Sequence, residues 1–138
     1  MSVYLIMFTA AASMYPGGSE NIQTATDGYS FFHNFLCDTN NEFTHSGLKN
    51  NGKVLANLAH IVLSLTMMSF FYVMPNIFNH SNRNTKLIKI LGVLAMAIFT
   101  FMYQEELHDL VVTLVGVFAS MAFLPIFIEL VKYKNRPF

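Results

Sequence analysis

Three long apolar stretches limit what this chain can fold into. They are Val54–Phe78, Leu87–Tyr103 and Leu110–Val131, and a shorter apolar stretch covers Ser2–Tyr15. An α-helix rises about 1.5 Å per residue, so roughly 20 apolar residues cross the ~30 Å hydrocarbon core of a bilayer. The second stretch is near the lower limit, and its basic flank can snorkel to complete the crossing. We predict membrane-spanning helices rather than the buried helices of a soluble domain, because 61–74 and 111–128 carry no charge on any face.

The predicted fold is an all-α integral membrane bundle that forms a single transmembrane domain over residues 1–138. Its four crossings are expected at about 2–15, 54–78, 87–103 and 110–131, and the polar segment 16–53 is expected to be an ordered outer loop. Composition agrees, since 54% of the residues are hydrophobic and 12% are charged. Within the loop, Tyr29, Phe32 and Leu36 lie at helical spacing, which predicts a short helix in the membrane interface.

The charged residues are divided between the two ends of the apolar stretches. Segments 16–53 and 104–109 carry a net charge of −5, from Glu20, Asp27, Asp38, Glu42, Glu105, Glu106 and Asp109 against Lys49 and Lys53. Segments 79–89 and 132–138 carry Arg83, Lys86, Lys89, Lys132, Lys134 and Arg136, which with Glu129 give a net charge of +5. Because an excess of Lys and Arg in short loops marks the cytoplasmic side, both termini are expected in the cytoplasm. A glycan on the acceptor triplet Asn79-His80-Ser81 would reverse this orientation.

The acidic end also collects most of the histidines. They are His33, His45, His60 and His108. His60 would lie about 9 Å inside a helix that starts near Val54 and would share a face with Asn57 and Ser64. Polar groups at that depth are expected to face the bundle or a wet cavity. On the last predicted helix, Asp109, Thr113, Gly116 and Ser120 form a comparable stripe.

If these two stripes face each other, a divalent-metal site is expected at the outer surface. Its predicted ligands are His60, His108 and a carboxylate from Asp38, Glu105 or Asp109, with Asp38 preferred. Zinc suits imidazole and carboxylate ligands and leaves a position for an activated water. The predicted catalytic residues are therefore Asp38, His60, His108 and Asp109, and a reaction at such a site would be metal-dependent hydrolysis of a lipid ester or an amide. No paired zinc motif such as H-x-x-x-H is present.

The same residues allow a structural interpretation. His60 could hydrogen-bond to Asn57 or to a neighbouring carbonyl, and His108 with its acidic neighbours could be a solvated turn. The chain would then be a non-catalytic accessory or structural subunit of a larger membrane assembly, with Gly116-x-x-x-Ser120 allowing close approach of another membrane subunit or a second copy. Glu129 is expected to form an interfacial ion pair with Lys132. Membrane lipids are the other expected partners, and nothing in the sequence resembles a nucleic-acid surface.

Two segments of the outer loop carry a resemblance to a family. They read Met14-Tyr15-Pro16-Gly17-Gly18-Ser19 and Asp27-Gly28-Tyr29-Ser30-Phe31-Phe32-His33-Asn34-Phe35-Leu36-Cys37-Asp38, followed by Gly47 and Asn50. This YPGGS…GYSFxxNFxxD pattern resembles a family of uncharacterised prokaryotic multi-pass membrane proteins, a domain of unknown function. Asp38 and His108 fall on matching positions, whereas Cys37 replaces the usual Ser. The resemblance implies a helical bundle in a prokaryotic cell membrane, with an outward-facing polar site, about six crossings in most members and no known activity.

Overall fold

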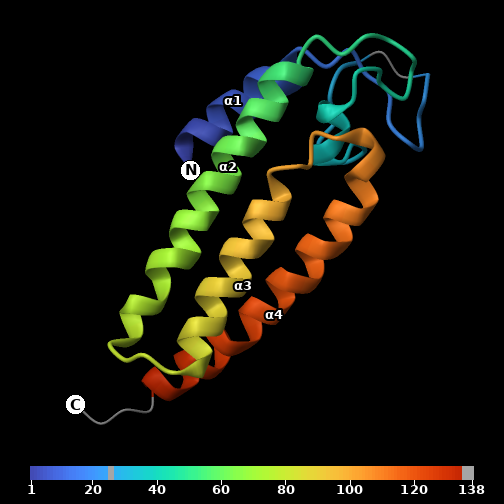
Figure 1. Ribbon diagram of the computed structural model, residues 1–138. Coiled ribbons are helices and arrows are strands. Elements are labelled where there is room, and N and C mark those ends of the chain that lie inside the picture. Colours follow the sequence, from blue (N-terminus) through green and yellow to red (C-terminus); the bar gives the residue numbers. More distant parts are fainter. Residues whose placement is uncertain (25–26, 135–138) are drawn as a thin grey trace. The chain divides into compact units, whose positions relative to one another are not determined.

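The computed structural model describes residues 1–24 and 27–134, and this part of the chain is all-α, with no β-sheet (Figure 1). The α-helices are α1 (Ser2–Ser13), α2 (Lys53–Val73), α3 (Arg83–Phe99) and α4 (His108–Lys134), and three short 3-10 helices are η1 (Leu36–Asn40), η2 (Met74–Phe78) and η3 (Glu105–Leu107). The predicted all-α class and the four helices are confirmed.

The chain forms two compact units, which are described separately. The first unit comprises Met1–Leu63 and Met102–Glu106, and the second comprises Ser64–Phe101 and the chain from Leu107 onward. Helix α2 begins in the first unit and ends in the second. The first unit thus contains α1, the start of α2 and the loop between them, and the second contains α3 and α4.

Two helical stretches are long and apolar enough to cross a membrane. They are Lys53–Phe78, which combines α2 with η2, and His108–Lys134, with 26 and 27 residues. At about 1.5 Å per residue each spans roughly 40 Å, which exceeds the hydrocarbon core of a bilayer. Helices α1 and α3 have 12 and 17 residues, so the crossings expected at 2–15 and 87–103 stay predictions.

Helix α3 begins and ends four residues earlier than the apolar pattern predicts. Its first turn is fixed by a reciprocal cap, in which the Asn82 side chain accepts from the Thr85 backbone N–H and the Thr85 hydroxyl accepts from the Asn82 N–H, both at 2.9 Å. Such a cap satisfies two donors that the helix cannot satisfy itself. The apolar pattern places the residues before Leu87 in a loop because it depends on apolarity and not on capping. The helix ends at Phe99, where a turn begins.

The interface helix expected through Tyr29, Phe32 and Leu36 is wrong for the described part of that segment. Residues 27–35 form turns, and only η1 follows. The reason is local competition for the backbone. The Asn34 side chain accepts from the Ser30 N–H, and the Asp38 carboxylate accepts from the Phe35 N–H, both at 3.0 Å. Short polar side chains that bind nearby backbone in this way favour turns over helix.

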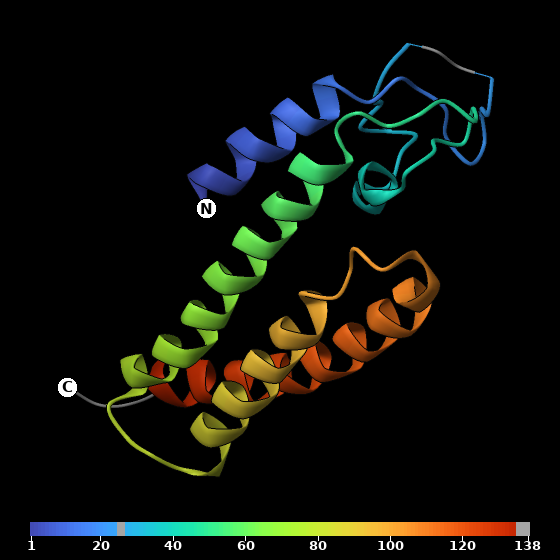
Figure 2. The same ribbon diagram turned by 45° about the horizontal axis from the view of Figure 1, so that its top comes forward.

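Helix α1 packs against the start of α2 through small residues (Figure 2). Ala11 is fully buried, and a Cβ at Gly52 would overlap its backbone carbonyl. Ala56 and Ala59, in the first turns of α2, are also fully buried. Small side chains let two helix backbones approach closely, so this corner of the first unit depends on Gly and Ala rather than on large apolar residues.

The second unit has an apolar core between α2, η2, α3 and α4. Its buried members are Phe71, Phe78, Ile88, Ala122 and Ile126. The ring of Phe71 lies directly on the backbone of Gly92, where a Cβ would overlap the ring. Helices α3 and α4 lie side by side here (Figures 1 and 2). The contact between Phe71 and Gly92 therefore determines how closely α2 and α3 approach in this unit.

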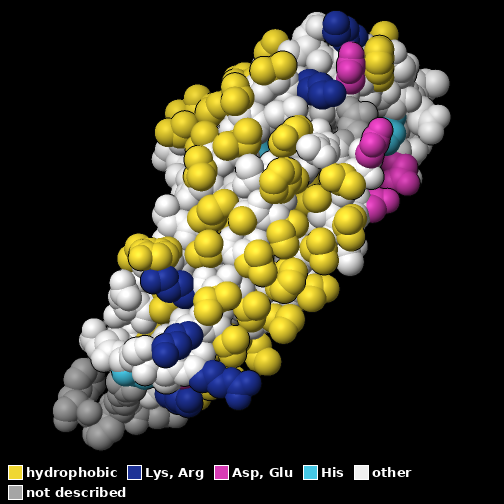
Figure 3. Space-filling model, in the orientation of Figure 1, with side chains coloured by type: hydrophobic (Ala, Val, Ile, Leu, Met, Phe, Trp, Pro, Cys, Tyr) yellow, Lys and Arg dark blue, Asp and Glu magenta, His cyan; other side chains and the backbone are white. Residues whose placement is uncertain are grey.

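Most of the remaining helix surface is apolar and exposed. On α4 alone, Leu124 and Phe127 are 65% and 66% exposed, and on α3 Ile90 is 62% exposed. Figure 3 shows hydrophobic side chains over the helices of the second unit, with Lys and Arg gathered near the start of α3 and the end of α4. Apolar exposure on this scale is unusual for a soluble monomer, where large contiguous patches mark interaction with a membrane or a partner.

Gly92→Ala is expected to destabilise the second unit, because the new methyl group would displace the Phe71 ring. Overpacking of this kind typically costs about 1–3 kcal/mol. Thermal unfolding followed by circular dichroism in detergent measures the effect. Gly116→Ala is the matched control, since no described atom lies within 4 Å of the added Cβ, and Ala is favoured over Gly in a helix by roughly 0.5–1 kcal/mol. Equal melting temperatures for the two variants would contradict a stabilising role of the contact between Phe71 and Gly92.

Candidate functional site

Asp38 is the centre of the folded loop in the first unit. It lies in η1 and is only 5% exposed. One carboxylate oxygen, Oδ2, accepts hydrogen bonds from the Asn34 side-chain amide and from the Phe35 backbone N–H, both at 3.0 Å. The other, Oδ1, lies 3.4 Å from Nε2 of His45. A buried carboxylate is stable only when its oxygens find donors, so this loop has to close around Asp38.

The same network reaches the Tyr-Pro-Gly-Gly turn. The Gly18 carbonyl accepts from the Asn34 amide at 2.7 Å and from the Tyr15 hydroxyl at 3.0 Å. The Ser46 hydroxyl donates to the Gly17 carbonyl at 3.1 Å. Gly18 has φ +91°, and a Cβ there would overlap the backbone of Ser46. The residues that carry the family resemblance are therefore brought together in one structure, which we call the cap (residues 15–52).

Asn50 closes the cap on its other side. Its amide donates to the carbonyls of Thr39 and Asn41 at 2.8 and 3.0 Å, and its side-chain oxygen accepts from the Gly52 N–H at 2.9 Å. All three interactions fix the chain where it enters α2. The expected ordered loop over 16–53 is thus a hydrogen-bonded structure in its described residues.

Two features of the cap bear on its chemistry, the side chain of His45 and a polar cavity beside Asn34. The side chain of His45 is 30% exposed, and its Nε2 faces the buried carboxylate of Asp38. Asn34, which holds Asp38, also lines a cavity of about 320 Å³ whose other polar walls include Ser19 and Ser30. The separation of 3.4 Å between His45 and Asp38 is an ion-pair contact, longer than an ordinary hydrogen bond.

Tyr29 lies beneath the same network. Its ring packs edge to face against Phe8 and Tyr15, with centroids 5.8 and 5.9 Å apart. Its hydroxyl is buried and has no hydrogen-bond partner among the described residues. Burial first, and the negative charge of Asp38 second, raise the pKa of Tyr29 to about 12. The phenol therefore stays neutral at physiological pH and contributes apolar packing under the cap.

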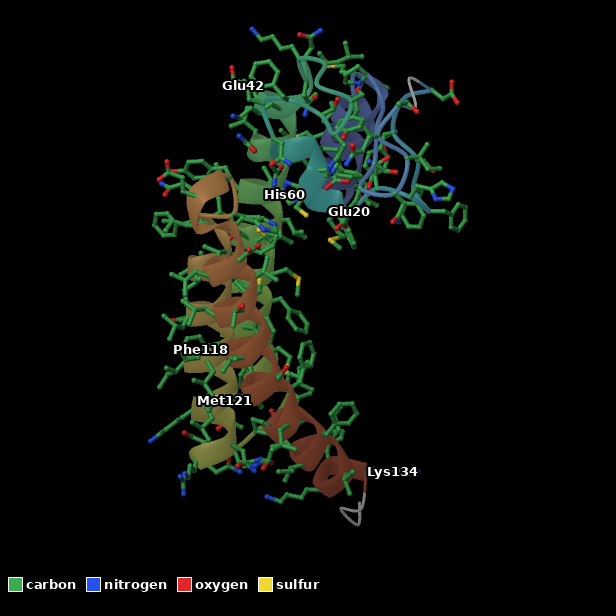
Figure 4. All side chains as sticks on the ribbon, turned by 90° about the vertical axis from the view of Figure 1, so that its right-hand side faces the viewer. Glu20, Glu42, His60, Phe118, Met121 and Lys134 are labelled. Atoms are coloured by element: carbon green, nitrogen blue, oxygen red, sulfur yellow. The ribbon has the colours of Figure 1, made fainter. Side chains whose placement is uncertain are left out.

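The structure places His60 in an aromatic environment in the first unit (Figure 4). It is 5% exposed, and the rings of Tyr4 and Phe8 pack against its imidazole with both centroid distances at 6.1 Å. Its Nδ1 is 2.9 Å from the carbonyl of Ala56, one turn earlier on α2. This is the contact with a neighbouring carbonyl that the structural interpretation expects.

His108 and Asp109 open α4 in the second unit. Nδ1 of His108 lies 3.0 Å from Oδ1 of Asp109, whose side chain is fully exposed. The acidic side chain at the first turn suits the positive end of the helix dipole. This pair resembles the solvated turn of the structural interpretation, although Nε2 of His108 is buried without a partner among the described residues.

The described residues contain no group of three or more His, Cys, Asp or Glu side chains that could hold a metal ion. Asp38 with His45, and His108 with Asp109, each provide two ligands, whereas zinc sites use at least three from the protein. The side chain of Glu105, one of the alternative carboxylates, lies outside the described residues. The metal site predicted from His60, His108 and Asp38 stays a prediction.

Glu129 has more partners than the sequence predicts. The expected pair with Lys132 is present at 3.0 Å, and the Glu129 side chain is fully buried within the protein. Its carboxylate also accepts from Asn84 at 2.6 Å and Asn82 at 3.1 Å, and it lies 2.8 Å from Nε2 of His80. The sequence offers one signal for this cluster. Glu129 is a single acid in an apolar stretch, and the segment 79–84, which the fold places next to it, is rich in Asn and also contains His80.

No protein-family model, curated protein or solved structure matches this chain. The resemblance of the cap residues to a prokaryotic membrane family therefore stays an expectation, and the function has to be inferred from the site itself.

Glu129→Gln is expected to destabilise the second unit, because it removes the charge that four donors surround and places an amide N–H₂ among them. Breaking one partner of a buried charged cluster costs about 3–5 kcal/mol. The measurement is thermal unfolding in detergent, and Glu106→Gln, at an exposed position, is the control. An unchanged melting temperature for Glu129→Gln would show that the cluster contributes little to stability.

Proposed function

We propose that this chain is a multi-pass integral membrane protein of a prokaryotic cell membrane, with a polar His/Asp site at the outer membrane face. Two stretches of sufficient length and the exposed apolar surface of α3 and α4 support membrane embedding. The remaining crossings are α1 and α3, which are short enough to require local thinning of the bilayer or snorkelling of flanking residues.

The charges of the second unit support the orientation. Its described basic residues lie in the first two turns of α3 or the last turn of α4, whereas Asp109 lies in the first turn of α4. By the positive-inside rule, the start of α3 and the end of α4 face the cytoplasm. Both termini are then cytoplasmic, and the segment before α2, which forms the cap, is on the outer side.

The pair of Asp38 and His45 is the single observation that supports a chemical role for the cap. Asp38 is held by Asn34 and Phe35, so its remaining oxygen can orient His45 without moving. A histidine oriented in this way can take a proton from water and return it to a leaving group, which is the chemistry of ester or amide hydrolysis. At the outer face the available substrates are the ester and amide linkages of lipids. A metal-dependent version would need further ligands to complete a zinc site.

The test is hydrolysis of fluorescent lipid esters and amides by the full chain in lipid nanodiscs. His45→Gln is expected to lower turnover by about 100-fold or more, because general acid–base catalysis typically contributes that much. Glu20→Gln, at an exposed position of the same cap, is the control and is expected to keep full activity. Loss of turnover on chelation, with recovery on adding Zn²⁺, would indicate the metal-dependent version. Turnover no higher than that of empty nanodiscs would overturn the hydrolytic role.

A second candidate function is a structural or accessory subunit, and one observation favours it. Thr113, Gly116 and Ser120 are exposed on α4, and within the described residues the space around Gly116 is open. Small residues at this spacing let a second transmembrane helix approach closely. The partner would be another membrane subunit or a second copy of the chain.

Gly116→Leu distinguishes this candidate, because a leucine would hold a partner helix away. The expected result is a smaller complex on a blue-native gel than the wild type forms. Val117→Leu, at the adjacent exposed position, adds a similar side chain outside the stripe and is expected to leave the complex unchanged. Wild-type protein that migrates as a single chain would contradict the subunit role.

A further inference from the structure

A polar cavity lies where α2 ends and α3 begins in the second unit. Its volume is about 560 Å³, and its walls include Asn76, Asn79, Ser81, Lys86 and Lys89. The two lysines are three residues apart on α3 and so lie on one face of the helix. The cavity is therefore lined by ammonium groups, side-chain amides and a hydroxyl, which are donors suited to an anion.

The surrounding electrostatics also favour an anion. Helix α3 begins at Arg83, so the positive end of its dipole faces the wall formed by Ser81, Thr85 and Lys86. His80 also lines the cavity, and its Nε2 is 2.8 Å from the carboxylate of Glu129.

Glu129 does not cancel this positive field. Its buried carboxylate is already surrounded by Asn82, Asn84, Lys132 and His80. The described basic residues at this end are Arg83, Lys86, Lys89, Lys132 and Lys134, and these five against Glu129 leave a net charge of +4.

A separate apolar groove lies in the same unit, next to the wall of the cavity that Lys89 forms. The groove has a volume of about 310 Å³ and is lined by Met68, Tyr72, Val73 and Val93, with Ser69. Lys89 belongs to the cavity and Tyr72 to the groove, and Nζ of Lys89 lies 3.5 Å from the centroid of the Tyr72 ring. This cation–π contact places the ammonium group of Lys89 against the wall of the groove, so the two spaces are adjacent.

The groove lies farther toward the middle of the helices than the cavity. Val93 lies one turn beyond Lys89 on α3, about 6 Å farther from the start of that helix. Met68 lies one turn before Tyr72 on α2, and thus farther from the end of that helix. A ligand with a charged group in the cavity would therefore place an apolar part along the helices, in the direction of the membrane interior.

We propose that this cavity and groove bind one anionic phospholipid of the inner leaflet. Its phosphate lies against Lys86 and Lys89, and an acyl chain lies in the groove beside Tyr72 and Val93. Basic pockets at the cytoplasmic ends of membrane helices recognise such headgroups. A free phosphate would use the cavity alone, whereas a phospholipid uses both the donors and the adjoining apolar wall. The proposal rests on the membrane embedding proposed above.

The test is native mass spectrometry of the full chain in a neutral detergent, titrated with dioctanoyl phosphatidylglycerol, dioctanoyl phosphatidylcholine or inorganic phosphate. Phosphatidylglycerol is expected to bind at least about tenfold more tightly than phosphatidylcholine, since one charge-assisted hydrogen bond accounts for roughly a tenfold change in affinity. Lys86→Gln with Lys89→Gln should remove this preference. Arg83→Gln with Lys134→Gln removes the same charge outside the cavity walls and should preserve it.

Val93→Trp tests whether the groove contributes to lipid binding, because the larger side chain would fill the groove. The variant is expected to weaken phosphatidylglycerol binding several-fold and to leave binding of inorganic phosphate unchanged. Equal wild-type affinity for the two lipids would overturn the proposal, as would equal losses in the two double variants. Inorganic phosphate that binds as tightly as the anionic lipid would identify a free phosphate as the ligand and overturn the lipid assignment.

Carbonate extraction separates failure of this site from failure of the membrane proposal. A chain released from membranes by alkaline carbonate would contradict membrane embedding and the lipid site together. A chain that stays in the membrane pellet but shows no preference for phosphatidylglycerol would contradict the lipid site alone. Circular dichroism of each variant checks its fold, and the wild-type comparison of the two lipids does not depend on any variant.

Discussion

Each compact unit of this protein is organised around one buried carboxylate, Asp38 in the first and Glu129 in the second. They are the buried acidic residues among those that the structure describes. A carboxylate removed from water is tolerated only with donors on its oxygens, so the surrounding loops must supply amides, imidazoles and backbone N–H groups. This requirement converts polar loops, which would otherwise be mobile, into fixed structures at the ends of apolar helices.

The two networks suit different tasks. The hydrogen bonds of Asp38 come from Asn34 and Phe35, close in the chain, and its other oxygen lies 3.4 Å from Nε2 of the partly exposed His45. Glu129 is surrounded by Asn82, Asn84, Lys132 and His80, so it anchors a loop, and the basic residues around it still leave this end with a net positive charge. The first arrangement favours chemistry in the cap, and the second favours binding of an anion beside the cluster.

Much of the fold could be predicted from the sequence, because apolar length and charge placement are local properties. The four helices follow the apolar stretches, with shifts at the ends where caps such as Asn82 and Thr85 determine the first turn. The candidate site was less predictable. The sequence indicates Asp38 and His60 as candidate metal ligands, and that assignment stays a prediction. The contacts of Asp38 with Asn34 and His45 depend on how the loop closes, and the packing of His60 against Tyr4 and Phe8 depends on how two helices meet.

The sequence by itself determined the all-α class, the approximate helix positions and the separation of acidic from basic ends, since each follows from the spacing and charge of neighbouring residues. Only the tertiary structure decided that Glu129 is fully buried, that Gly92 lies beneath Phe71, and that Lys89 of the polar cavity contacts Tyr72 of the apolar groove. These features depend on contacts between residues 17 to 49 positions apart, from Tyr72 with Lys89 to His80 with Glu129. Burial and hydrogen bonding at such separations result from packing, which no local pattern in the chain records.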